Sequence, residues 1–199
     1  MIHELISRYP QLSVCEADLL GAKDAMVQTY RQGGKILLCG NGGSAADCDH
    51  IAGELLKGFR SLRPVTDETL PADLREKLQG SLPAISLHSA CAAMTATLND
   101  LDPDIVYAQM LHGLGAKGDL LIALSTSGNA QNVCNAARLA RAKGLTVLGL
   151  TGAMGGKLKE LSDLCICVPE TETYKVQELH LPVYHYLCSK TEEVLFGES

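Results

Sequence analysis

Two pairs of polar residues in this sequence could carry chemistry if they lie on helices. His50 and Glu54 are four residues apart, so on a helix they share one face. Gln177 and His185 are eight apart and lie on roughly one side of an uninterrupted helix, although Pro182 between them can kink it. Imidazole, carboxylate and amide groups can hold a metal ion or transfer protons. The His50 and Glu54 pair alone is more typical of a surface ion pair, so both interpretations stay open.

Two loops that combine glycine with hydroxyl side chains could hold a phosphate group. The first is residues 39–47, CGNGGSAAD, and the second is residues 124–129, LSTSGN; each lies between a predicted strand and a predicted helix. Glycines let backbone amides approach a ligand, a helix N-terminus favours an anion, and hydroxyls donate hydrogen bonds. Either loop alone is also typical of a turn with a helix cap. Together they suit a sheet that binds ligands beyond the carboxyl ends of its strands.

A parallel sheet is predicted by five short apolar runs that would position these loops. The strands are predicted at residues 35–39, 83–87, 119–124, 146–150 and 164–168, and helices at 16–31, 44–57, 90–98, 130–142 and 174–195. Near-continuous apolar strands that alternate with helices are typical of an α/β fold. Residues 1–33 precede the first strand, so we expect this helical segment to pack on the outside or on another copy of the chain.

The composition indicates one soluble domain. The chain has 199 residues, and we interpret residues 1–199 as a single domain with an insertion or lid at 60–82, which contains a short predicted helix at 72–79. The net charge of -6 argues against direct binding of nucleic acid. The eight cysteines are scattered, as expected for reduced thiols, and no apolar stretch reaches the roughly 20 residues that a membrane span needs. We therefore expect a cytoplasmic protein without membrane contact.

Four ordered motifs resemble those of a known enzyme family. GNGGSAAD at 40–47, His50-x-x-x-Glu54, STSGN at 125–129, and Gln177-Glu178-x-His180 followed by His185 are similar to the phosphoheptose (sedoheptulose 7-phosphate) isomerases, which have the sugar isomerase (SIS) fold. The resemblance implies a Rossmann-like, three-layer αβα sandwich with a five-stranded parallel sheet. It also implies a homotetramer, with residues 1–33 at its interface and active sites nearby, and a step in making the heptose of bacterial surface glycans.

The resemblance further implies roles for individual residues. Glu54 and His185 would be the acid-base pair, and zinc would be held by His50, Glu54, Gln177 and His185. The expected sugar-phosphate contacts are Asn41, Gly42, Gly43, Ser44, Asn99, Asp100, Ser125, Thr126, Ser127, Asn129 and Gln177. Conversion of sedoheptulose 7-phosphate to D-glycero-D-manno-heptose 7-phosphate removes a proton from the carbon next to a carbonyl and returns one to the neighbouring carbon. The intermediate is an enediolate, whose negative charge zinc can stabilise. We interpret His180 as a core histidine.

Some positions differ from the family pattern. Ala130 replaces a usual serine, Tyr174 a common aspartate, and Lys57-Gly58 a usual Gly-Arg, so we expect an altered sugar pocket. Two alternatives stay open. The first is a regulatory SIS protein that binds a phosphosugar without catalysis, such as one that associates with the DNA-replication initiator. The second is a structural protein without a small ligand, in which both loops are ordinary caps.

Overall fold

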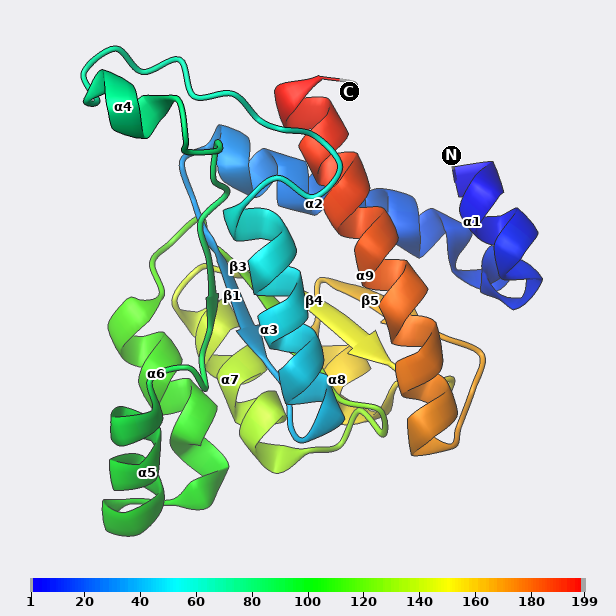
Figure 1. The fold of residues 1–199 in the computed structure, drawn as a ribbon. Coiled ribbons are helices and arrows are strands. Elements are labelled where there is room, and N and C mark those ends of the chain that lie inside the picture. The colour runs from blue at the N-terminus through cyan, green and yellow to red at the C-terminus, as the bar shows by residue number, and fades with distance from the viewer. Residues whose placement is uncertain (1, 198–199) are drawn as a thin grey trace.

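A five-stranded parallel sheet lies between two layers of helices (Figure 1). The computed structural model describes residues 2–197. The strands are β1 (Ile36–Cys39), β2 (Ala84–Ser86), β3 (Leu120–Leu124), β4 (Thr146–Thr151) and β5 (Leu164–Cys167), in the order β2-β1-β3-β4-β5. Each predicted strand is present, with both bounds within one residue of the prediction. The α/β sandwich expected from the sequence is therefore confirmed.

Alternate side chains of the strands point into two separate cores. Ile36 and Leu38 of β1 face the first core, whereas Leu37 and Cys39 face the second. The first core is covered by α2 (Glu16–Arg31), α3 (Gly43–Leu56) and α9 (Thr173–Phe196). The second is covered by α6 (Val106–Leu114), α7 (Gln131–Ala142) and α8 (Gly156–Leu161). Burial on both faces explains why the strands are continuously apolar.

The helices follow the predicted pattern, with two additions. Residues 1–33 form α1 (Ile2–Arg8), the 3-10 turn η1 (Pro10–Cys15) and α2 in their described part, and α5 (Cys91–Asp100) follows β2. The sequence did not predict α6, which follows the turn η2 (Pro103–Ile105), or the short α8. Pro182 lies inside α9 without ending it. Among residues 2–197, no helix combines the length and apolarity that crossing a bilayer requires.

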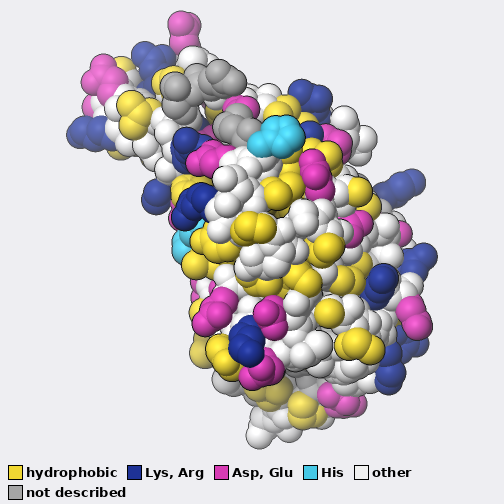
Figure 2. Space-filling view, turned by 90° about the vertical axis from the view of Figure 1, so that its right-hand side faces the viewer, with side chains coloured by type: hydrophobic (Ala, Val, Ile, Leu, Met, Phe, Trp, Pro, Cys, Tyr) yellow, Lys and Arg dark blue, Asp and Glu magenta, His cyan; other side chains and the backbone are white. Residues whose placement is uncertain are grey.

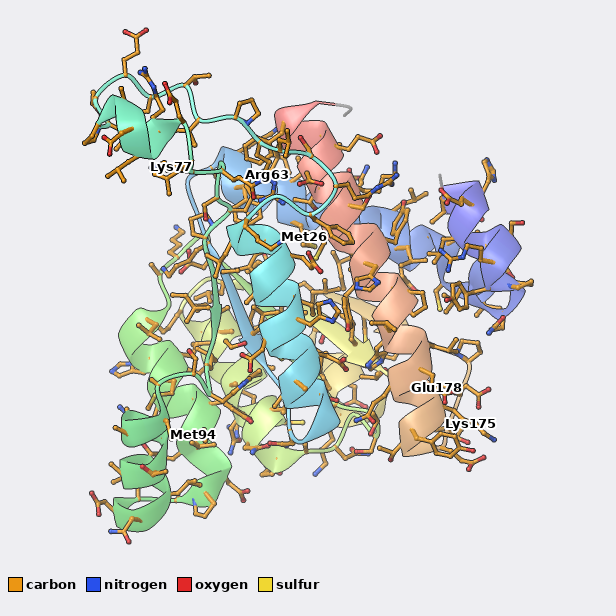
Figure 3. All side chains as sticks on the ribbon, viewed as in Figure 1. Met26, Arg63, Lys77, Met94, Lys175 and Glu178 are labelled. Carbon is orange, nitrogen blue, oxygen red and sulfur yellow. The ribbon has the colours of Figure 1, made fainter. Side chains whose placement is uncertain are left out.

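Residues 60–82 leave the body of the molecule and return to it beside the ends of α3 and α9 (Figure 1). Lys77 marks the projecting part in Figure 3. The helix predicted at 72–79 is shorter than expected, since α4 spans only Ala72–Arg75. A single antiparallel bridge between Pro64 and Gln79 holds the two arms of the segment together. Most side chains between these positions are exposed, so packing does not extend the helix.

A buried ion pair anchors the base of this segment. Arg63 is fully buried, and its Nε donates to Glu192 Oε1 of α9 at 2.7 Å. The same guanidinium donates to the carbonyl oxygens of Glu54 at 3.0 Å and Leu55 at 2.6 Å, and so caps the end of α3. Figure 3 shows Arg63 between the ends of α3 and α9. Burial alone would raise the pKa of Glu192. Hydrogen bonds from the backbone amides of Phe59 and Arg60, together with the Arg63 guanidinium, instead hold this pKa below its usual value.

We expect Glu192→Gln to lower the free energy of unfolding by about 3–5 kcal/mol, because it leaves the Arg63 charge buried without a counter-ion. Urea unfolding measures the change. Glu172→Gln is the matched control, since it breaks an exposed pair with Lys175 that water screens, so we expect a much smaller change. Equal effects of the two substitutions would contradict a structural role for the buried pair.

Candidate functional site

Three of the four predicted metal ligands meet where α3 packs against α9 (Figure 1). His50 Nε2 lies 3.1 Å from Glu54 Oε1 on the same helix, as their spacing predicted. His50 Nε2 also lies 3.3 Å from His185 Nε2 on α9. A cleft of about 460 Å³ opens beside His185, between α1, α9 and the chain at Phe59 and Arg60. Of the three residues, His185 lines this cleft.

The donor set of this cluster fits a zinc ion. One donor atom from each of His50, Glu54 and His185 lies within 4.8 Å of the others. Zinc bonds of about 2.0–2.2 Å at tetrahedral angles would separate neighbouring donors by roughly 3.3–3.6 Å. The two separations of 3.1 and 3.3 Å are close to that value. Burial lowers the pKa of His185, and the neighbouring His50 lowers it further. The lower pKa favours the neutral imidazole that binds metal.

Gln177, the fourth predicted ligand, lies beside the first glycine loop. It is two turns before His185 on α9, and its side chain packs against the backbone of Gly43. A Cβ at Gly43 would lie 2.7 Å from Gln177 Nε2, closer than real Cβ contacts. A side chain at position 43 would therefore require the end of the Gln177 side chain to move away. The role of Gln177 as a ligand remains a prediction.

The two glycine and hydroxyl loops are neighbours at the carboxyl edge of the sheet. They follow β1 and β3, which pair directly. Asn41 and Asn132 exchange two amide hydrogen bonds, at 2.9 and 3.0 Å, and so link the first loop to the helix that follows the second. The Tyr107 hydroxyl donates to the Gly40 carbonyl, and its oxygen also lies 3.1 Å from Asn41 Oδ1. Both loops therefore border one region, as ligand binding there requires.

The second loop has a backbone that depends on Gly128. This glycine has a φ of +67°, and a Cβ there would lie 1.9 Å from the Gly155 carbonyl oxygen. Asn129 Oδ1 accepts from the Lys157 amide, which ties the loop to the start of α8. Ser125 is buried and Ser127 is exposed, with Thr126 between these extremes. The three hydroxyl side chains of this loop therefore range from buried to exposed.

Asn99 and Asp100 lie at the exposed end of α5, which packs against α6. The side chain of Asn99 donates to Asp100 Oδ1 at 2.7 Å. In Figure 1, α5 lies at the lower left, across the molecule from α9. The structure therefore does not bring these two residues to the histidine cluster, and their contact with the sugar remains a prediction.

Sequence reasoning missed two groups that touch the cluster. The Tyr184 hydroxyl lies 3.0 Å from His50 Nδ1 and 3.3 Å from Asp47 Oδ1. Asp47 is part of the first loop motif and lies one turn before His50, which was an available signal. Tyr184 adjoins His185 in sequence, but consecutive helical residues point about 100° apart, so spacing did not indicate it.

His180 is a buried residue that connects α9 to the sheet. It is 0% exposed, and its Nε2 lies 3.3 Å from the Thr151 carbonyl at the end of β4, in position to donate. Burial lowers its pKa to about 4, despite that hydrogen bond. Its Nδ1 has no protein partner among residues 2–197. These features agree with its interpretation as a core histidine.

Comparison with known proteins gives consistent matches. Residues 10–80 and 77–152 match the family model of the SIS domain. The chain is 41% identical over 180 residues to a phosphoheptose isomerase of Roseiflexus sp. (strain RS-1), which covers 90% of this chain and 83% of that protein. It is 40% identical over 185 residues to one of Rhodospirillum rubrum, covering 93% and 90%. The solved phosphoheptose isomerase of Neisseria gonorrhoeae aligns with a TM-score of 0.79 and 31% identity, covering 96% and 95%.

We expect His180 to make stability depend on pH between about 6.5 and about 4. In that range the unfolded chain binds a proton at this position and the folded chain does not, so the free energy of unfolding falls as pH falls. The slope due to His180 is at most about 1.4 kcal/mol per pH unit. Urea unfolding of His180→Gln should lack this component, with exposed His3→Gln as the control. Parallel pH curves for wild type and His180→Gln would contradict it.

Proposed function

This chain belongs to the phosphoheptose isomerases, a family of SIS-domain proteins, and we propose that it converts sedoheptulose 7-phosphate to D-glycero-D-manno-heptose 7-phosphate. Membership at 41% identity over most of the chain makes it a phosphosugar isomerase. The observation that carries the proposal is the convergence of His50, Glu54 and His185 at the contact of α3 with α9, where α3 begins in one of the two loops suited to a phosphate.

In the proposal the phosphate lies between the two loops. Ser44, buried in the first turn of α3, and the hydroxyls of Ser125, Thr126 and Ser127 provide donors from both sides. The N-terminus of α3 adds favourable electrostatics for an anion. Further contacts with the sugar phosphate are assigned to Asn41, Gly42, Gly43, Asn99, Asp100, Asn129 and Gln177.

The distance along α3 supports a long sugar. His50 is six residues after Ser44, which corresponds to about 9 Å along the helix axis. A phosphate at the start of α3 and a reacting carbon near His50 are then separated by a chain of several carbons. This arrangement favours a heptose phosphate over a triose phosphate.

Proton transfer is assigned to two side chains on facing helices. Glu54 uses Oε1 in its contact with His50, so its second carboxylate oxygen is available to remove the proton from the carbon next to the carbonyl and to return it to the neighbouring carbon. His185, on α9, moves protons on the sugar oxygens. His50, Glu54 and His185, with Gln177 as the fourth proposed ligand, would hold a zinc ion, whose positive charge would stabilise an enediolate.

We also propose a homotetramer with residues 1–33 at its interface. This segment exposes large apolar side chains, with Val14 72% and Leu20 39% exposed. Figure 2 shows hydrophobic side chains gathered across the middle of the face on which α1 and α9 lie in Figure 1. Residues 60–82 retain their interpretation as an insertion or lid, and their projection from the body is consistent with it.

A regulatory protein that binds a phosphosugar without turning it over is the alternative. Metal analysis of the purified protein, combined with an assay on sedoheptulose 7-phosphate, separates the two. Stoichiometric zinc with turnover supports the isomerase. A thermal shift with sugar phosphates, without zinc or turnover, would support the regulatory alternative instead.

We expect Glu54→Gln to lower kcat by at least about 100-fold, because the amide cannot accept the proton. Binding of the sugar phosphate, measured by calorimetry, should change little, since the phosphate lies at the other end of α3. Zinc content is measured in parallel, so that lost metal is distinguished from a lost base. An unchanged kcat would exclude Glu54 as the base.

We expect Ser127→Ala to raise KM about 10-fold with little change in kcat, because its hydroxyl contacts the phosphate and not the reacting carbons. Steady-state kinetics measures both constants. Ser13→Ala, an exposed serine outside the loops, is the control. A normal KM in Ser127→Ala would remove this hydroxyl from the phosphate site.

A further inference from the structure

The two ring nitrogens of His50 face different environments. Nε2 points to Glu54 Oε1 and His185 Nε2, where the proposed zinc would lie. Nδ1 lies 3.0 Å from the hydroxyl of Tyr184, which itself lies 3.3 Å from Asp47 Oδ1. Asp47, Tyr184 and His50 therefore form a continuous chain of polar contacts that ends at the cluster.

The charge at the start of this chain sets the direction of its hydrogen bonds. An ionised carboxylate only accepts hydrogen bonds, so the Tyr184 hydroxyl donates its single hydrogen to Asp47. The hydroxyl oxygen then accepts, and His50 Nδ1 is the donor. A neutral imidazole with its hydrogen on Nδ1 has a lone pair on Nε2. That lone pair can bind a metal, but without one it faces the acceptor Glu54 Oε1 at 3.1 Å, so Glu54 by itself favours a hydrogen on Nε2.

Packing holds the rings in this arrangement. Tyr184 is 2% exposed, so water competes little for its hydroxyl. Its ring contacts that of His50 edge-on, with centroids 5.3 Å apart, and that of His185 at 5.0 Å. The rings of His50 and His185 are 4.9 Å apart. One side chain thus orients both imidazoles.

We propose that Tyr184, together with Asp47, is a positioning residue that keeps His50 in the Nδ1-H tautomer and so presents Nε2 to the metal. The metal rests on the proposed function, and its positive charge would offset the preference of Glu54 for a hydrogen on His50 Nε2. Partners behind metal-bound histidines typically change metal affinity by about 10–100-fold when removed. Such a partner is commonly a carboxylate bonded directly to the histidine, whereas here Tyr184 lies between Asp47 and His50.

Tyr184→Phe is the direct test, because it removes the hydroxyl and keeps the ring. Zinc affinity is measured by competition with a chromophoric chelator, and we expect it to fall about 10–100-fold. Asp47→Ala should act in the same direction, because the Tyr184 hydroxyl is then free to donate to His50 Nδ1. The double variant should lose no more than the larger single effect. Tyr30→Phe, which removes a hydroxyl bonded to the Pro83 carbonyl, is the matched control.

The tautomer is read independently of zinc and of activity. Long-range ¹H-¹⁵N spectra are recorded on metal-free protein at pH 8 in a Glu54→Gln background, in which the carboxylate no longer favours Nε2-H. His50 should be protonated on Nδ1 in this background and with Tyr30→Phe added, and shifted toward Nε2-H when Tyr184→Phe or Asp47→Ala is added. An Nε2-H ring in Glu54→Gln, or an unchanged tautomer there with unchanged zinc affinity in Tyr184→Phe, would overturn the inference. If the wild type binds no zinc but the Glu54→Gln background shows the expected tautomers, the positioning of His50 stands and the metal-assisted function fails.

Discussion

The contact between α3 and α9 determines whether this protein has a site at all, because neither helix carries a complete set of reactive groups. Three links hold the helices together along their length. Gly43 admits the side chain of Gln177 at one end. His50 meets Tyr184 and His185 in the middle. At the other end, Arg63 joins the last carbonyls of α3 to Glu192 on α9. The cluster therefore lies between two anchored ends and not at a free helix crossing.

Helix α3 connects the proposed phosphate site to the proposed reactive side chains. The first turn of α3 borders the two loops at the edge of the sheet, and the later turns carry His50 and Glu54. A ligand whose anionic group binds at the start of α3 thus has its far end directed along α3 toward the cluster. Because Asn41 bonds Asn132 in the helix that follows the second loop, the proposed anion site would form from two adjacent strands and not from a single loop.

Patterns within one element were readable from the sequence, and contacts between distant elements were not. Continuous apolar runs predicted all five strands, because burial on both faces leaves a strong local signal. The four-residue spacing of His50 and Glu54 predicted their contact. Arg63 and Glu192 are 129 positions apart, so nothing local indicates that the pair is buried. Tyr184 is recognisable only once α9 is packed on α3. The short helix α6 was not predicted from the sequence, because it depends on packing against α7.

The central claim is that His50, Glu54 and His185, from two helices, form one metal site beside a bound sugar phosphate. The most direct measurement is anomalous diffraction at the zinc edge from crystals grown with zinc and sedoheptulose 7-phosphate. The account predicts one strong anomalous peak among these three side chains, with the phosphate between the loops that contain Ser44 and Ser127. A zinc peak at other residues, or a phosphate bound away from both loops, would contradict it.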